Sequence, residues 1–237
     1  GNGADNLQVR VYISTPTMRQ GFSAFFSVQE AAVWTDVVLT LPGETLRPGL
    51  GAPYKTGSPT SVVAGNSLGV TVTAVDQYGN KVNQSGVAAL TLPTAGVFAN
   101  LGSPAQVAFD QGQGNGAVQI YTAGTSVLVA SVSANGFNDS SQATVSVGPY
   151  SASTGKLVLL APGETLIPGA TSPPGKDSSG ILPIEANDPL SFRLLACDRF
   201  YNFDATYTGN NKSLSSDDGA ISLSNLTLNS GSATVSN

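Results

Sequence analysis

A segment that occurs twice constrains this chain more than any other feature of its sequence. Residues 41–49 read LPGETLRPG, and residues 161–169, which lie 120 positions later, read APGETLIPG. Residues 73–80 and 195–202 form a second related pair, offset by 122 positions. Because both pairs keep their order at nearly the same spacing, the chain is predicted to contain two copies of one structural unit.

Each unit has the pattern of short strands separated by turns. Alternating apolar residues mark one strand in each unit, namely Leu68, Val70, Val72 and Ala74 in the first and Leu190, Phe192, Leu194 and Ala196 in the second. Period-two alternation is typical of half-buried strands. Further strands are expected at residues 87–92, 106–109, 117–122, 126–134 and 142–147, with residues 112–116 as a hairpin loop. This spacing predicts an all-β fold of sandwiches with about seven strands each.

Composition agrees with a folded β-protein and argues against several other classes. Hydrophobic residues make up 41% of the 237 residues and the net charge is only −5, whereas disordered chains combine low hydrophobicity with high net charge. The ten Lys and Arg residues are not clustered, so no nucleic-acid partner is expected. No apolar run reaches the roughly 18 residues that a membrane-spanning helix needs, so no membrane span is expected.

The positions of the repeats divide the chain unequally. If Pro42 and Pro162 mark equivalent points, residues 36–150 hold one complete module, and residues 151–237 hold a second module that lacks its last strands. Residues 1–35 are expected to be terminal strands from the end of a preceding module, because residues 9–12 (VRVY) resemble residues 118–121 (VQIY). An open sandwich exposes unpaired backbone and core side chains, so something must complete the second module.

Three ways of completing the second module are open. The chain is a window from a longer array, or the N-terminal strands of one copy fill the gap in its neighbour and so build a fibre. The third way is a closure within one chain, in which residues 7–28 fold back onto the second module. The head-to-tail match between the two ends of the chain favours the first two.

The stretch from Asp76 to Val82, DQYGNKV, resembles the D-x-Y-G-N-x-V signature of the bacterial immunoglobulin-like repeats in invasin and intimin stalks. In such a turn the Asp and Asn side chains cap backbone amides, Gly takes the positive-φ position and the aromatic ring packs over the edge of the sandwich. The second unit reads DRFYNF and carries Tyr201 where the first has Gly79. The resemblance implies tandem immunoglobulin-like β-sandwiches in an extracellular stalk, adhesin or surface layer.

Residues that usually carry catalysis are scarce. The chain has no histidine, which removes Ser-His-Asp and Cys-His arrangements, and Cys197 follows apolar residues that favour a buried core position. The acidic residues fall mostly in turns, where capping is the simpler role, so no enzyme and no catalytic, cofactor-binding or metal-binding residue is predicted. A structural calcium ion is the one ligand left open, with residues 217–219 (DDG) and the Asp198/Asp204 neighbourhood as candidates and solvated turn acids as the alternative.

Aromatic residues near the N-terminus support two interpretations. Phe22, Phe25, Phe26 and Trp34 lie close together in the sequence, and strict alternation places Phe22, Ala24 and Phe26 on one strand face. That face is expected to pack in a core, between modules or as a donor strand. A sugar-binding surface is the alternative, which exposed aromatic residues in a line would favour and full burial would oppose.

The prediction from sequence is therefore a structural or adhesive extracellular repeat protein, such as a cell-surface stalk, coat or filament subunit, assembled covalently or by strand complementation. Its expected partners are copies of itself or adjacent modules, together with a surface glycan or a receptor. Proline- and glycine-rich segments at residues 42–51 and 162–175 are expected to set the angles between modules. The alternative function is a carbohydrate-binding accessory region of a secreted enzyme.

Overall fold

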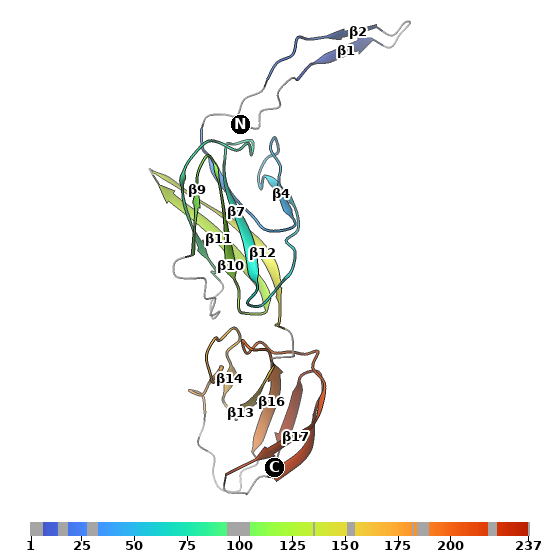
Figure 1. The fold of residues 1–237 in the computed structure, drawn as a ribbon, viewed down its shortest axis with the longest axis vertical. Coiled ribbons are helices and arrows are strands. Elements are labelled where there is room, and N and C mark those ends of the chain that lie inside the picture. Colours follow the sequence, from blue (N-terminus) through green and yellow to red (C-terminus); the bar gives the residue numbers. More distant parts are fainter. Residues whose placement is uncertain are drawn as a thin grey trace.

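The computed structural model of the chain describes residues 7–13, 19–27, 33–93, 105–134, 136–150, 155–181, 183, 190–217 and 222–236. All regular secondary structure in these residues is β-strand, which confirms the all-β prediction. Figure 1 shows three parts in a row: an N-terminal hairpin, a first strand group (residues 33–150) and a second strand group (residues 155–236). No helix in the described residues could cross a membrane.

The N-terminal hairpin consists of β1 (Arg10–Ile13) and β2 (Arg19–Phe22), which pair antiparallel. A bridge between Leu7 and Phe26 extends it. Every residue of both strands is exposed. In Figure 1 the hairpin projects from the end of the first strand group that lies away from the second group, so a closure within one chain is not the arrangement seen.

The first strand group contains two principal sheets, with strand orders β10-β7-β3 and β6-β12-β11-β8-β9. Their strands are β3 (Asp36–Thr40), β6 (Val62–Val63), β7 (Ser67–Val75), β8 (Gly86–Thr91), β9 (Ala105–Phe109), β10 (Gln113–Gln119), β11 (Gly124–Ala134) and β12 (Phe137–Gly148). A short hairpin of β4 (Glu44–Leu46) and β5 (Lys55–Gly57) lies between β3 and β6 in the chain. The predicted strands correspond to β7 through β12, with ends that differ by a few residues.

One hydrophobic core joins the two sheets of the first strand group. The four alternating residues of β7 are buried as predicted, and Leu128, Ala130 and Val132 of β11 are in the same cluster. Burial of each such large side chain contributes on the order of 1.5–3 kcal/mol. Trp34 packs against this core, with its ring stacked on Phe137 at 3.8 Å between centroids. This group of residues therefore begins slightly before residue 36.

The second strand group repeats only part of this order. Its three-stranded sheet, β13-β16-β19, corresponds in chain order to β3-β7-β10, and two further pairs, β14-β15 and β17-β18, correspond to β4-β5 and β8-β9. The bounds are β13 (Lys156–Leu160), β14 (Thr165–Leu166), β15 (Lys176–Asp177), β16 (Ser191–Cys197), β17 (Gly209–Ser215), β18 (Ser222–Leu228) and β19 (Ser232–Ser236). The described part of this group holds no counterpart of β11 and β12.

Residues 112–116 do not form the predicted hairpin loop. Residues from Gln113 onward belong to β10, in which Gly114 lies opposite Val72 of β7. The turn comes earlier, at Gln111 and Gly112, which both have positive φ. Glycine is used inside this strand because a Cβ on Gly114 would lie 2.2 Å from the Ala108 carbonyl oxygen. Close approach of a neighbouring backbone, and not loop formation, accounts for this glycine.

Candidate functional site

The Glu of the repeated PGET segment forms a partly buried ion pair. In the first copy the Glu44 carboxylate accepts a hydrogen bond from the Leu41 amide at 2.9 Å and pairs with the Lys55 ammonium at 3.0 Å. Lys55 also donates to the Leu39 carbonyl of β3 at 2.7 Å. The pair thus fastens the β4-β5 hairpin to the outer strand of the sheet, which explains why these residues recur together.

The second copy has the same arrangement. Glu164 accepts from the Ala161 amide at 2.8 Å and pairs with Lys176 at 2.6 Å, and Lys176 donates to the Leu159 carbonyl at 2.9 Å. Burial alone would raise the pKa of Glu164, but hydrogen bonds from Lys176, Ser178 and Ala161 lower it to about 2. The carboxylate is therefore charged and structural, and it is not a candidate general acid.

The Asp76 turn has the caps predicted from its motif. One Asp76 carboxylate oxygen accepts from the amides of Tyr78 and Asn80 at 2.8 and 2.9 Å. The Asn80 side-chain amide donates to the other oxygen at 3.0 Å, and Gly79 has a φ of 74°. The two side chains thus fix the conformation of a turn that projects the ring of Tyr78 from the end of the sheet.

The Asp198 turn repeats this geometry with a different residue at the positive-φ position. Asp198 accepts from the Phe200 and Asn202 amides at 2.8 and 2.9 Å. Tyr201 adopts a φ of 61°, which few non-glycine residues do. Its ring lies over Gly175, where a Cβ would approach it to 2.0 Å.

In the first strand group, the position equivalent to Tyr201 is a glycine and the position equivalent to Gly175 is a tyrosine. Tyr54 lies over Gly79, as Tyr201 lies over Gly175. Tyr54 and Gly175 are equivalent, because each carbonyl accepts a bond from the matching amide of Arg47 or Ile167. The tyrosine and the glycine have therefore exchanged positions between the two units. Although the second unit departs from the turn motif at Tyr201, an aromatic ring occupies the same place in both units.

The Asp198 turn also forms the joint between the two strand groups. The Phe200 ring is only 8% exposed and is part of the core cluster of the first group. It contacts Tyr121 at 4.7 Å and Tyr150 at 6.1 Å between ring centroids. A Cβ on Gly65 would lie 2.3 Å from this ring, so glycine leaves the space that the ring fills.

Polar groups of the same turn bind the end of the first strand group. The Asn202 side chain accepts from the Ala123 amide at 2.8 Å and donates to the Tyr121 carbonyl at 2.7 Å. The Tyr150 amide donates to Asp198 at 2.7 Å. Asn202 is 1% exposed and these bonds satisfy its amide, so the joint is a packed interface with specific directionality.

Residues 162–175, one of the two segments expected to set the angles between modules, lie against the first strand group. The chain passes from one strand group to the other between β12 and β13, not through residues 162–175. From that segment Pro168 contacts the first group, since its carbonyl accepts from the Thr122 hydroxyl at 3.4 Å. The connection is short, and the turn around Phe200 forms most of the contact.

One face of the second strand group is exposed, whereas the equivalent face of the first strand group is covered by strands of that same group. In the first group, Val37 of β3 is 4% exposed, and its amide donates to Asp139 of β12 at 2.7 Å. Its counterpart Leu157 of β13 is 48% exposed. Likewise, β8 pairs with both β9 and β11, whereas the only pairing described for β17 is with β18. In the part of the chain that the structure describes, this face therefore exposes the apolar side chain of Leu157 and is bounded by an edge of β17 that pairs with no strand.

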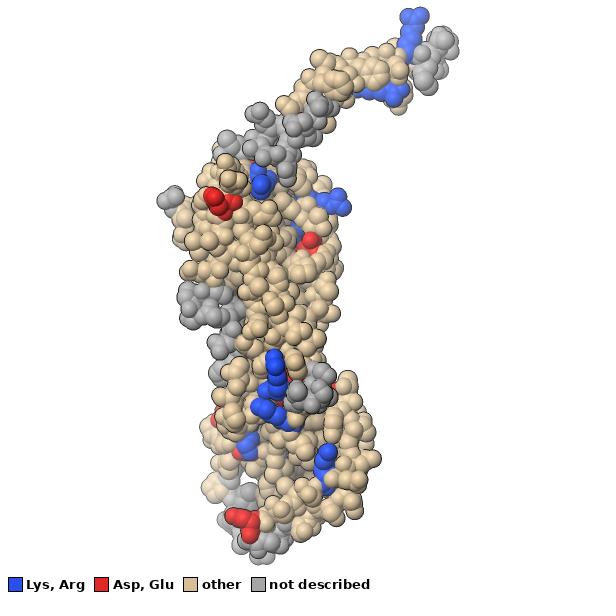
Figure 2. All heavy atoms as spheres, in the orientation of Figure 1, with Lys and Arg blue, Asp and Glu red and all other residues tan. Residues whose placement is uncertain are grey.

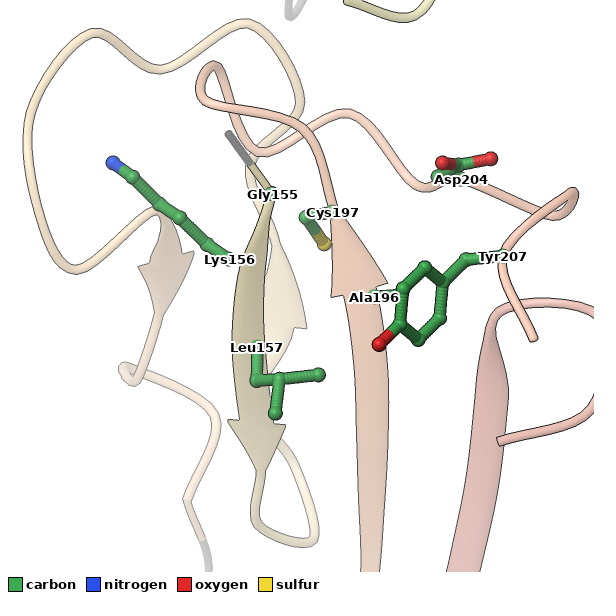
Figure 3. Close-up of a pocket in the computed structure, with 7 residues that line it drawn as sticks. All are labelled: Gly155, Lys156, Leu157, Ala196, Cys197, Asp204 and Tyr207. Atoms are coloured by element: carbon green, nitrogen blue, oxygen red, sulfur yellow. The ribbon is translucent and has the colours of Figure 1, made fainter. Parts of the chain in front are cut away.

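A small hollow of about 100 Å³ marks one end of this open face. Leu157, Ala196 and Tyr207 contribute to its lining. Figure 3 shows the Leu157 side chain reaching from β13 toward β16, the Tyr207 ring beside Ala196, and Lys156 pointing away from both. In the first strand group, β12 lies against β3, the strand equivalent to β13.

The N-terminal hairpin carries exposed apolar side chains that nothing in the described chain covers. Leu7, Val9, Val11 and Ile13 alternate along one strand and are all exposed. In the view of Figure 2 charged side chains are scattered over the molecule, and most of the surface carries none. A two-stranded hairpin with this much exposed apolar surface is only marginally stable by itself in water.

The predicted aromatic face is not formed as expected. Phe22, Phe25 and Phe26 are exposed, and only Trp34 packs in a core. The register also shifts by one residue between the pairs Arg10–Phe22 and Leu7–Phe26, so strict alternation does not carry from Phe22 to Phe26. The expected burial of Phe22 and Phe26 within this chain is wrong.

The calcium candidates do not form a metal centre in the described residues, which contain no cluster of three or more potential ligands. Asp198 binds amides, and Asp204 accepts from the Thr206 amide and hydroxyl. Asp218 and Gly219 lie outside the described residues. The Cys197 thiol is buried, as predicted, and burial together with Asp198 and Asp204 raises its pKa to about 12, so it is not a nucleophile.

No family model and no curated protein matches the sequence. Distant structural likenesses exist to trypsin-activated alpha-2-macroglobulin of Escherichia coli (11% identity, TM-score 0.38, 98% of this chain) and to the Salmonella alpha-2-macroglobulin mutant Y1175G (12%, 0.33, 98%). The chain spans 17% of the length of each. The Escherichia coli adhesin FdeC matches at 13% identity and a TM-score of 0.32, over 97% of this chain and 69% of FdeC. Likenesses this distant establish no family.

Proposed function

We propose that this protein is a non-enzymatic, structural or adhesive subunit of an extracellular array on a microbial surface. In this proposal the two strand groups are tandem immunoglobulin-like modules, and the N-terminal hairpin of one copy completes the open second module of the next. Function is then mechanical, with sandwiches as spacers and the Phe200 joint as a fixed connection between them.

Two features support the proposal: a face and strand edge of the second strand group that no described strand covers, and an exposed N-terminal hairpin. The second strand group has an uncovered apolar face and a free edge on β17, at the place where the first strand group holds the hairpin β11-β12. The N-terminal hairpin is a similar pair of antiparallel strands, and it precedes β3 in the chain as β11-β12 precedes β13. Strand addition to an exposed edge is an established mode of protein recognition, and a head-to-tail contact of this kind propagates.

Alternation indicates which face of the hairpin enters the core. Val9, Val11 and Ile13 lie on one side of the strand, whereas Arg10 and Tyr12 lie on the other, where the Arg10 guanidinium is 5.9 Å from the Tyr12 ring centre. The inner side of β11 has the same aliphatic character, with Leu128 and Val132 fully buried. The Val11 side is therefore the side that fills the open module.

A charge on the inserting side tests this proposal. Val11→Glu is expected to abolish concentration-dependent assembly in light scattering, because it places an unpaired carboxylate in a core. Gln20→Glu adds the same charge to the other side of the hairpin and is the matched control, which should still assemble. Equal assembly by both variants, or no assembly by the unmodified chain at any concentration, contradicts strand complementation.

A carbohydrate-binding role is the second candidate, because Phe22, Phe25 and Phe26 are exposed and not buried. Aromatic faces of this kind stack on sugar rings as readily as they fill a core. Binding to immobilised surface polysaccharides that is lost when all three residues are changed to Ala, in a chain that stays monomeric, would favour this function over assembly.

A further inference from the structure

We infer that the β17-β18 hairpin carries a glycan-attachment site, formed by two sequons that lie side by side on its exposed face. A sequon is the pattern Asn-x-Ser/Thr, at which an oligosaccharide is attached to the asparagine side chain. Residues 211–213 (NKS) form one sequon in β17, and residues 225–227 (NLT) form the other in β18. The inference rests on the extracellular location in the proposed function, but it is independent of strand complementation.

Two β-bulges bring the sequons together. The register of the hairpin shifts on both sides of the Lys212–Leu226 pair, because β17 has one extra residue before Lys212 and β18 has one extra residue before Leu226. Lys212 and Leu226 are the middle residues of the two sequons, which therefore face each other in antiparallel order.

The backbone at both asparagines has the same unusual conformation. Asn211 has a φ of 57° and Asn225 a φ of 59°. Asparagine adopts this left-handed conformation more readily than most residues, so the bulges account for an asparagine at each position. They do not account for the hydroxyl residue that follows two positions later in both strands. The bulges also interrupt the regular ladder, which makes the acceptor amides accessible at the surface.

The side chains that the modification needs are all exposed, namely Asn211, Ser213, Asn225 and Thr227. Within the residues that the structure describes, neither asparagine side chain makes a hydrogen bond. The middle residues Lys212 and Leu226 are half-buried, and the Lys212 ammonium lies 5.8 Å from the centre of the Tyr207 ring. A sugar on either asparagine would therefore extend into solvent without displacing a contact.

Two further sequons in the chain are held by other contacts. In residues 83–85 (NQS) the Ser85 hydroxyl donates to Asp110 at 2.5 Å. Residues 138–140 (NDS) lie in the unbroken ladder between β11 and β12, and the middle residue Asp139 accepts from the Val37 amide. Neither combines a free hydroxyl with an interrupted ladder, so the paired sequons of the hairpin are the preferred acceptors.

The co-reactant is an oligosaccharide linked through diphosphate to a lipid. The asparagine amide nitrogen attacks C1 of the first sugar, the C–N bond forms as the bond from C1 to the diphosphate oxygen breaks, and the amide gives up one proton. Asn211 and Asn225 are diagonal neighbours across the two strands, and such neighbours are about 7–8 Å apart. The first oligosaccharide therefore blocks access to the second asparagine, so each chain carries one glycan.

Mass spectrometry of the chain isolated from the surface of the cells that produce it tests the inference. One oligosaccharide is expected per chain, on Asn211 or Asn225. Ser213→Ala should move the glycan to Asn225, Thr227→Ala should move it to Asn211, and the double variant should lose it. Ser215→Ala removes an exposed hydroxyl of the same strand outside the sequon, and this matched control should leave the modification unchanged.

The outcomes separate this inference from the proposed function. A surface-located chain with an unmodified mass overturns the inference and leaves the proposed function standing. Glycans on Asn83 or Asn138 alone, or on both hairpin asparagines of one chain, also overturn it. If the chain is found only inside the cell, the proposed function fails, and the inference fails with it.

Discussion

Tyr201 has a positive φ, a backbone conformation that favours glycine. The residue under its ring, Gly175, is a glycine, which leaves the space that the ring fills. In the first strand group the order is reversed, with Tyr54 over Gly79. Tyr54 donates to Asp36 at 2.9 Å, while the Tyr201 ring receives the Lys156 ammonium at 4.0 Å from its centre. Asp36 and Lys156 begin the equivalent strands β3 and β13, so each ring closes the same corner of its sheet by a different polar contact.

This exchange predicts a specific rescue. Tyr201→Gly should lower the free energy of unfolding by about 2–4 kcal/mol, because the lost ring leaves a cavity that relief of the positive φ only partly offsets. Adding Gly175→Tyr should restore at least half of the loss, since residue 175 already has the φ that Tyr54 adopts. Denaturant titration measures both, with Tyr201→Phe as the control that keeps the ring. A double variant less stable than Tyr201→Gly alone contradicts the equivalence.

Glu164 predicts a pH dependence of stability. Its pKa is near 4.5 when the chain is unfolded and about 2 when folded, so its stabilising contribution is complete above pH 4.5 and is lost as the pH falls through 2. Glu164→Gln should therefore lower stability at neutral pH by about 1–3 kcal/mol and flatten the loss between pH 4.5 and 2. Urea titrations at several pH values measure this.

Asp217→Asn is the matched control for Glu164→Gln, because it removes an exposed carboxylate from the same strand group. It should leave the pH profile close to that of the unmodified chain. The assignment of the acid-sensitive step to Glu164 is wrong if both variants show the same profile.

At the residue scale the sequence predicted what depends on local chemistry. The caps of the Asp76 and Asp198 turns and the burial of Cys197 follow from residues next to one another in the chain. The exchange of Tyr201 with Gly175 was not foreseen, because the two residues are far apart in sequence and the motif alone shows only that Gly79 has been replaced.

At the scale of elements, the edge of β17 that lies away from β18 is the feature on which the proposed assembly depends. Its counterpart β8 lies between β9 and β11, with Ala88 through Thr91 paired to β11. Among the residues that the structure describes, β17 pairs with β18 alone. A free edge next to exposed apolar side chains is a site for strand addition by another chain.

The proposed strand addition predicts slower amide hydrogen exchange at the edge of β17 that lies away from β18. In the variant lacking residues 1–27, β17 amides that point away from β18 should exchange rapidly, and in the assembled intact chain they should slow by about tenfold or more, because an added strand accepts their hydrogen bonds. The β8 amides are the internal control and should be protected in both samples. Equal exchange of β17 in the two samples would show that no strand is added there.

Strands were predictable where apolar residues alternate, as in β7 and β16, because the pattern itself reflects one buried face. Strands are less predictable where glycines serve close packing, so the glycines at residues 112–116 predict a loop where β10 begins. Residues 9–12 resemble residues of β10 in sequence, yet Arg10–Ile13 pair with β2, whereas β10 pairs with β7. Pairing is decided by partners distant in sequence, which alternation does not specify.

For the whole molecule, the two units inferred from the repeated segments have unequal cores. The first strand group buries a continuous cluster between two sheets, whereas the cluster around Leu194, Ala196 and Leu228 in the second is small. The exposed hairpin lies at the opposite end of the molecule from the second group (Figure 1). These two features, the exposed hairpin and the exposed Leu157 face of the second strand group, are the ones that the proposed head-to-tail contact brings together.

The molar mass of the intact chain, measured by light scattering over a range of concentrations beside the variant lacking residues 1–27, tests this account most directly. The account predicts that the intact chain grows well beyond its 24.0 kDa monomer into linear particles, whereas the truncated variant stays a folded monomer. An intact chain that remains a monomer at every concentration, with the truncated variant equally folded and monomeric, would contradict head-to-tail assembly through the hairpin.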